Sequence, residues 1–231
     1  MATAENRVQF TISDEELRQA LQKALKSNFL DNLRDRNPFV KLDSAIRGNL
    51  GEICFSKWLT QNGIEVAASN QMNDGSDIDI DFSFNNETTK DIRLELKTSL
   101  IPDVWKTLDE VMQKADIKII KRPGESVASD IKSDFHAQIY FNRLTKQRDA
   151  FLKAIKGVPT DYSEDSLLSV MDLSSLRQAF VAWIDKPTLV AWLNLQTQKT
   201  WQFSFRNFWR CPLHMAKEPT LLPDAIRNYK R

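Results

Sequence analysis

Two short runs of alternating polar and apolar residues constrain the fold of this chain more than any other feature of its sequence. In residues 77–84, acidic residues and a serine alternate with isoleucine and phenylalanine, and in residues 92–97 Arg, Glu and Lys alternate with Ile and Leu. Because successive side chains of a strand point to opposite faces, each run predicts a strand with one apolar face. Asn85 and Asn86 lie between the runs, so the pair predicts an antiparallel hairpin.

Two helices are expected before this hairpin. The segment from Ser13 to Glu16 has the spacing of a capping box and opens a helix over about 13–28 with one apolar face. A second helix is expected over about 43–62, ending at Gly63. Its apolar residues cover most of the circumference, which is typical of a helix that is buried on more than one side.

The remainder of the chain predicts further strands and helices around one core. Residues 103–121 are expected to be helical at first and extended at the end, and residues 143–157 to be helical. Apolar runs predict strands at 136–141, 179–184, 189–195 and 200–205. This order predicts an α/β fold with a central mixed β-sheet flanked by helices. We expect an N-terminal helical extension (1–40) at the edge of the core or in a subunit contact, a core domain (41–210) and a C-terminal tail (211–231) packed on the core.

Composition excludes several classes of protein. The 231 residues contain 32 Lys and Arg against 31 Asp and Glu, so the net charge of +1 gives no global attraction to nucleic acid. The two cysteines have no zinc-site spacing and are expected to be reduced packing residues of a cytoplasmic protein. No run of 18 apolar residues and no secretory signal is present, so no membrane span is expected.

The polar face of the hairpin carries the candidate chemistry. Asp77, Asp79 and Asp81 share one face of the first strand, and Glu95 and Lys97 share one face of the second. Carboxylates that converge in this way repel one another, and a fold tolerates them most easily around a cation. Hard oxygen ligands suit Mg²⁺ or Mn²⁺, and a neighbouring lysine can orient a water molecule. The alternative is an ordinary polar face of a half-exposed sheet.

The segments GNLGEICFSKWL, GSDIDIDF and LELKTS resemble, in this order, the PD-(D/E)xK nuclease superfamily with its restriction-endonuclease-like fold. In that family a helix that often carries Glu precedes a hairpin with Asp on one strand and E-x-K on the next. The resemblance covers about residues 40–100. It implies the following roles: Asp77 as the family aspartate with Asp79 as the alternative, Glu95 and Lys97 as the E-x-K pair, the Leu96 carbonyl as a further metal ligand, and Glu52 as the helix glutamate.

The function implied by this resemblance is Mg²⁺-dependent cleavage of double-stranded DNA. A type II restriction or phage-defence endonuclease is the first hypothesis, and a homodimer is expected because two antiparallel strands are cut by two sites related by a twofold axis. The alternatives are a DNA repair or recombination nuclease and a catalytically inactive DNA-binding domain of the same fold. An RNA substrate also stays open.

Basic residues after two of the predicted elements are candidates for DNA contacts, and their alternative interpretation is a solvated helix face. These residues are Lys121, Arg122, Arg143, Lys146 and Arg148. Arg206 and Arg210 interleave with aromatic residues, which we interpret as core residues rather than as a DNA contact. His136 opens an apolar strand and is interpreted as a satisfied core or edge histidine.

Overall fold

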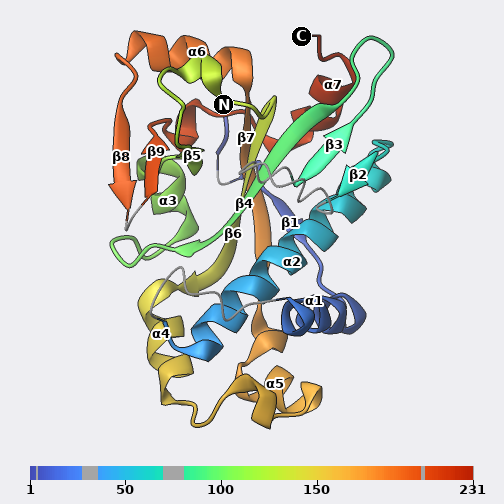
Figure 1. Cartoon of the computed structure of the whole chain (residues 1–231), viewed down its shortest axis with the longest axis vertical. Helices are drawn as coiled ribbons and strands as arrows, with labels where there is room; N and C mark the ends of the chain where they lie inside the picture. Colours follow the sequence, from blue (N-terminus) through green and yellow to red (C-terminus); the bar gives the residue numbers. More distant parts are fainter. Residues whose placement is uncertain (4, 28–35, 70–80, 204–205, 231) are drawn as a thin grey trace.

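The computed structural model describes residues 1–3, 5–27, 36–69, 81–203 and 206–230. The fold is mixed α/β, as predicted, with a six-stranded sheet flanked by helices and a separate three-stranded sheet beside it (Figure 1). In the large sheet the strand order is β1 (Val8–Phe10), β7 (Gln178–Asp185), β6 (Phe135–Leu144), β4 (Ile92–Ile101), β3 (Phe82–Phe84) and β2 (Ala68–Ser69). The small sheet has the order β5 (Ile119–Lys121), β9 (Arg206–Trp209) and β8 (Thr200–Phe203).

The predicted hairpin is confirmed over its described part. Strands β3 and β4 are antiparallel, with Phe82 opposite Leu94 and Phe84 opposite Ile92. All four side chains are buried in one hydrophobic cluster. Residues 77–80 of the first predicted strand lie outside the described residues. Strand β4 continues the sheet by pairing in parallel with β6, and β6 pairs antiparallel with β7.

Two helices cover this sheet beside the hairpin. Helix α1 (Asp14–Lys26) begins with the predicted capping box, in which the Ser13 hydroxyl and the Glu16 carboxylate each accept a backbone N–H. Helix α2 (Pro38–Gln61) runs diagonally in Figure 1 and passes in front of β7. It meets β4 at Gly51, where a β-carbon would overlap the Thr98 methyl group. The absence of a side chain at this position therefore sets how closely α2 approaches the strand.

The small sheet and its helices enclose a second hydrophobic cluster on the left of Figure 1. This cluster includes residues of β7 together with side chains from α3 (Leu108–Lys114) and α6 (Lys186–Leu195). The remaining helices are α4 (Thr145–Ala154), α5 (Glu164–Val170) and α7 (Leu222–Arg227). Short 3-10 turns lie at Ala128–Asp130, Pro159–Asp161, Leu173–Ser175, Leu213–Met215 and Pro219–Leu221.

The prediction of a strand at 189–195 is wrong, because these residues belong to helix α6. The Asp185 carboxylate accepts the Thr188 backbone N–H at 2.8 Å and caps the helix, and Pro187 lies in its first turn. Both features favour a helix start. A short apolar run does not by itself distinguish a buried strand from one turn of a buried helix.

The two ends of the chain are integrated into the core. Strand β1 pairs with the edge of β7, and α1 contributes buried residues to the cluster that contains the hairpin. At the other end, Lys217 pairs with Trp183 of β7 through backbone hydrogen bonds, and Ile226 packs in the same cluster as α1. In the described ranges, no helix has the length and apolar character needed to span a membrane.

Candidate active site

The register of the hairpin places Asp81 beside Glu95. Phe82 and Leu94 are cross-strand partners with side chains in the core, so the preceding and following residues, Asp81 and Glu95, face the other side of the sheet. The backbone N–H of Asp81 donates to the Leu94 carbonyl at 3.2 Å, which extends the pairing by one residue. The Asp81 carboxylate accepts the Leu96 N–H at 2.5 Å. Asp81 is therefore fixed against the strand that carries the predicted E-x-K residues.

Glu95 is fully buried and lies among three nitrogen-bearing side chains. One carboxylate oxygen is 2.9 Å from Lys97 Nζ, and the other is 3.1 Å from an Arg122 guanidinium nitrogen and 3.4 Å from His136 Nδ1. Burial alone would raise the pKa of Glu95, but Lys97, His136 and Arg122 lower it by more, so the pKa lies well below its ordinary value. Glu95 is consequently an ionised carboxylate in a closed environment.

Asp81 experiences the opposite balance. Burial raises the pKa of Asp81, and the negative charges of Glu95 and Glu52 raise it further. Lys97 and the Leu96 N–H lower it only in part, so the pKa of Asp81 is about 7. Two buried carboxylates with opposite pKa shifts therefore lie next to each other, and their mutual repulsion favours a bound cation or a proton at Asp81.

Glu52 reaches this cluster from helix α2. It follows Gly51, the residue at which α2 packs against β4, and its charge raises the pKa of Asp81. Because side chains alternate along β4, Thr98 lies on the core face with Leu94 and Leu96, whereas Glu95 lies on the other face. Of the predicted site residues, Glu95 and Lys97 lie 2.9 Å apart, with Leu96 between them along β4, and the role of Glu52 stays a prediction.

Arg122 joins the cluster from the small sheet, immediately after β5. Its backbone N–H donates to the Glu125 carboxylate at 3.0 Å, and the same oxygen accepts the Trp209 Nε1–H at 3.1 Å. The Arg122 side chain is 9% exposed, so its guanidinium faces Glu95 rather than open solvent. The basic segment 118–122 indicates a DNA contact in the sequence, and no residue pattern there reveals this buried ion pair.

The other sequence candidates lie in different surroundings. Asp77 and Asp79 lie outside the described residues. Lys121 is half-buried, with Nζ 4.3 Å from the centre of the Trp209 ring, and Lys146 is exposed at the start of α4. Arg143 binds the Asp172 carboxylate at 2.7 Å. Arg148 is buried and ion-paired with Asp43 at 2.9 Å, which makes it a group of the interior rather than of a DNA-facing surface.

Sequence reasoning gave too little weight to two residues. Asp81 shares its predicted face with Asp77 and Asp79, and only the register with Leu94 shows that Asp81 lies opposite Glu95. His136 was interpreted as a core residue, and it is 1% exposed. The parallel pairing of β6 with β4 places His136 beside Glu95, a relation between two strands that are far apart in the sequence.

The donor chemistry of Asp81 and Glu95 fits a magnesium ion. Within the described ranges, no group of three or more His, Cys, Asp or Glu side chains is arranged to hold a metal ion. Magnesium, however, commonly binds through one or two carboxylates and keeps several waters. Asp81 and Glu95 are two adjacent carboxylates of this kind, and burial raises the pKa of Asp81 to about 7. Both Glu95 oxygens are ion-paired here, with Lys97 at 2.9 Å and with Arg122 at 3.1 Å, so a metal ion would take the place of one of these cations.

Comparisons with known proteins identify no relative of this chain: no family model, no curated protein and no solved structure matches it.

Proposed function

We propose that this protein is a Mg²⁺-dependent endonuclease that hydrolyses phosphodiester bonds of double-stranded DNA. The observation that carries the proposal is the grouping of Asp81, Glu95 and Lys97 on one face of β3 and β4. Glu52 approaches the same group from the helix that precedes the hairpin. Two carboxylates, a lysine and a helix glutamate are the components that the sequence resemblance implies for this activity.

Asp81 and Glu95 are the described residues that would hold the metal ion. The Leu96 carbonyl, Asp77 and Asp79 are further ligands implied by the sequence resemblance. When bound, Mg²⁺ would polarise the scissile phosphate and lower the pKa of a coordinated water. The low pKa of Glu95 keeps this ligand ionised throughout the neutral range, whereas Asp81 loses its proton as the pH rises through about 7.

Lys97 is the described residue best suited to position the attacking water. Its Nζ lies 2.9 Å from Glu95, and its side chain remains 20% exposed, so it contacts both the carboxylate and the accessible side of the cluster. An ammonium at this position also offsets the negative charge that develops on a phosphate during attack. Its role in the proposal is to orient water and to stabilise that charge.

The biological role proposed is that of a type II restriction or phage-defence enzyme. Discrete fragments from a plasmid would support this role, whereas heterogeneous products would favour a repair or recombination nuclease. A twofold dimer is part of the proposal because it would present one site to each DNA strand.

Incubation of supercoiled plasmid with Mg²⁺ tests the proposal. Wild-type protein should cut, Glu95→Gln and Lys97→Met should lose cutting, and Lys114→Met should retain it, because Lys114 is an exposed residue of α3. Glu95→Gln preserves side-chain size and Lys97→Met preserves most of its length. Retained DNA binding without cutting in wild-type protein would instead support the catalytically inactive DNA-binding domain.

A further inference from the structure

The small sheet has one face that does not pack on the second hydrophobic cluster. Ile119 and Trp209 are cross-strand partners that are fully buried in this cluster. The next row across the three strands has Phe208 in the middle, with Ile120 of β5 opposite it on one side and Trp201 of β8 on the other. Because side chains alternate along a strand, this second row lies on the other face of the sheet.

This other face carries an aromatic strip. The Trp201 and Phe208 rings are stacked, with centroids 4.6 Å apart and planes inclined by 20°. Phe203 extends the strip toward the end of β8 and is 55% exposed. None of these three residues belongs to either of the two hydrophobic core clusters. Phe208 is itself only 6% exposed and is stacked with the half-buried Trp201, so Phe203 and part of Trp201 form the accessible portion of the strip. An exposed aromatic ring of this kind is typical of a binding surface.

Cations flank the aromatic strip at both ends. Arg206 is exposed and lies directly opposite Phe203. At the other end, Arg210 donates its backbone N–H to the Lys199 carbonyl at 3.0 Å, so two exposed cations lie on neighbouring chain segments. Lys199 and Arg210 also line a groove of about 280 Å³ together with Trp192. The carboxylate of Asp116 is ion-paired with Arg210 at 3.6 Å.

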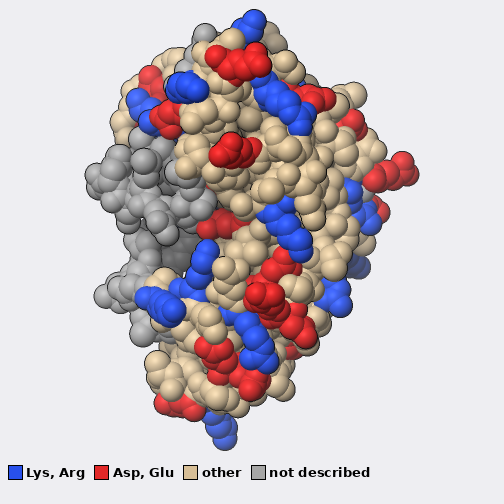
Figure 2. Space-filling model, turned by 90° about the vertical axis from the view of Figure 1, so that its right-hand side faces the viewer, with Lys and Arg blue, Asp and Glu red and all other residues tan. Residues whose placement is uncertain are grey.

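A different charge pattern is seen on the side of β2, β3 and α7, which Figure 2 shows face on. There, Lys and Arg side chains are intermixed with Asp and Glu over the whole visible described surface. Intermixed charges give no net attraction for a polyanion, whereas cations at both ends of an aromatic strip complement the phosphates of a nucleic acid.

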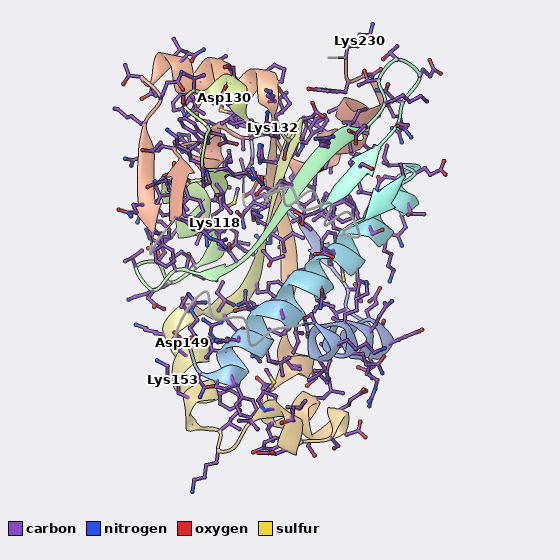
Figure 3. All side chains as sticks on the ribbon, in the orientation of Figure 1. Lys118, Asp130, Lys132, Asp149, Lys153 and Lys230 are labelled. Carbon is purple, nitrogen blue, oxygen red and sulfur yellow. The ribbon has the colours of Figure 1, made fainter. Side chains whose placement is uncertain are left out.

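Two contacts fix the small sheet relative to the candidate active site. Arg122, which follows β5, is ion-paired with Glu95 at 3.1 Å. The Gln138 side chain donates to the Lys97 carbonyl at 3.0 Å and accepts the Lys118 N–H at 3.2 Å. Lys118, labelled in Figure 3, lies just before β5 on the side toward β4. The small sheet is therefore joined to Glu95 and Lys97 by direct side-chain contacts.

We propose that the face of the small sheet formed by Trp201, Phe203 and Phe208, with Lys199, Arg206 and Arg210 around them, binds duplex DNA and delivers it to the candidate active site. The choice of DNA among polyanions rests on the proposed function. The cations contact backbone phosphates, and the exposed Phe203 ring with the accessible part of Trp201 packs against the sugar–base edge of a groove.

The test uses full-length protein with Glu95→Gln, so that DNA is bound without being cut. The affinity for a 30-base-pair fluorescent duplex is measured between 0.05 and 0.3 M salt, and again after Lys199→Gln with Arg206→Gln. Loss of two phosphate contacts should reduce the slope of log K against log salt by about 2 and weaken binding roughly 30-fold at 0.15 M salt. Thermal unfolding verifies that the doubly substituted protein remains folded.

The matched control is Lys26→Gln with Lys153→Gln. Both lysines are exposed, and Lys153, labelled in Figure 3, lies on α4 at the opposite end of the molecule from α6. This control has the same net charge as the test variant and should bind within about twofold of the Glu95→Gln parent. An equal loss of affinity in the two variants would overturn the proposal, because only net charge would then matter.

Further outcomes separate this inference from the proposed activity. If wild-type protein cuts plasmid while the Lys199 and Arg206 substitutions leave binding and its salt dependence unchanged, the nuclease proposal stands and the small-sheet surface is refuted. If no cutting occurs but those substitutions weaken duplex binding as predicted, the surface stands and the nuclease proposal is refuted. Tighter binding to a single-stranded 30-mer than to the duplex would overturn the assignment of duplex DNA.

Discussion

Two buried acidic clusters in this protein differ in one respect that separates a structural group from a candidate catalytic one. In the first, Asp43 of α2 lies between two guanidinium groups, at 2.8 Å from Arg47 and 2.9 Å from Arg148. In the other cluster, Asp81 lies beside the carboxylate of Glu95, and Glu95 is ion-paired with Lys97 and Arg122. Both aspartates are almost completely buried.

The pKa values of the two aspartates are shifted in opposite directions. Burial raises the pKa of Asp43, but Arg47 and Arg148 lower it by more, so the pKa lies below its usual value. At Asp81, burial together with Glu95 and Glu52 prevails, and the pKa rises to about 7. The charge of a buried carboxylate that is paired with two cations is already compensated. A buried carboxylate next to another carboxylate is stabilised by a proton or a metal ion, which identifies the second cluster as the functional candidate.

The largest expected effect on stability is at Asp43. Asp43→Asn leaves the buried Arg47 and Arg148 without their shared anion, and we expect a loss of about 3–5 kcal/mol in the free energy of unfolding. Urea unfolding at pH 7 measures this loss. Asp149→Asn is the control, because Asp149 is partly exposed and also contacts Arg148, and it should cost less than about 1 kcal/mol. Similar losses in both variants would show that the Asp43 cluster is not a self-contained ion network.

Lys97→Met should have a large effect on activity and a small effect on stability. Cleavage should fall by about 10²–10³-fold, since the group that offsets phosphate charge is lost. The free energy of unfolding should fall by less than in Asp43→Asn, because Lys97 is 20% exposed and Arg122 remains paired with Glu95. Plasmid cleavage and urea unfolding give the two values. A stability loss as large as that of Asp43→Asn, with cleavage retained, would show that Lys97 stabilises the fold and does not take part in cleavage.

Asp81→Asn should act on stability with the opposite sign to Asp43→Asn. Because the pKa of Asp81 in the folded protein is raised to about 7, its contribution to stability is complete below its unfolded pKa of roughly 4 and declines as the pH rises through 7. In metal-free buffer at pH 8, the substitution should therefore stabilise the fold by about 1–3 kcal/mol. At pH 4 the gain should disappear. Urea unfolding at the two pH values measures this difference, and a destabilisation at pH 8 would contradict the assigned pKa shift.

The smallest expected effects concern the helix that carries Asp43 and Glu52. Gly51→Ala introduces a methyl group against Thr98 and should cost about 1–3 kcal/mol while weakening activity, since Glu52 moves away from β4. Gly48→Ala on the same helix is the matched control. No atom lies within 4 Å of its added methyl group, so it should stabilise the helix by about 0.5–1 kcal/mol. Equal responses at the two glycines would argue against a close helix–strand contact at Gly51.

Local patterns predicted most of the elements that build the candidate site. Alternation in 92–97 identified β4, and the apolar residues of 82–84 identified its partner, because a buried face requires this periodicity. The capping box at Ser13 predicted the start of α1 to within one residue. The apolar run at 189–195 was misassigned because the helix start depends on the side chain of Asp185, which precedes that run.

Relations between distant segments were not predictable in this way. Which of Asp77, Asp79 and Asp81 lies opposite Glu95 depends on the hairpin register. Alternation fixes the face on which these side chains lie, but it fits equally well when the register shifts by two residues. The contacts of Glu95 with Arg122 and His136 arise from the docking of β5 and β6 on β4. Arg148 illustrates the same limit, since its basic segment is typical of a surface and its partner Asp43 lies 105 residues earlier.

Calorimetric titration of Mg²⁺ or Mn²⁺ into the protein tests most directly whether Asp81 and Glu95 form a metal site. At pH 6, in two buffers that differ in ionisation enthalpy, binding to wild-type protein should release about one proton, because the Asp81 carboxyl is protonated there and the bound form is ionised. At pH 8.5 the release should fall close to zero, Asp43→Asn should behave like wild type, and Asp81→Asn should bind at least about tenfold more weakly. Metal binding that is independent of pH and of Asp81, or no binding at all, would contradict the account.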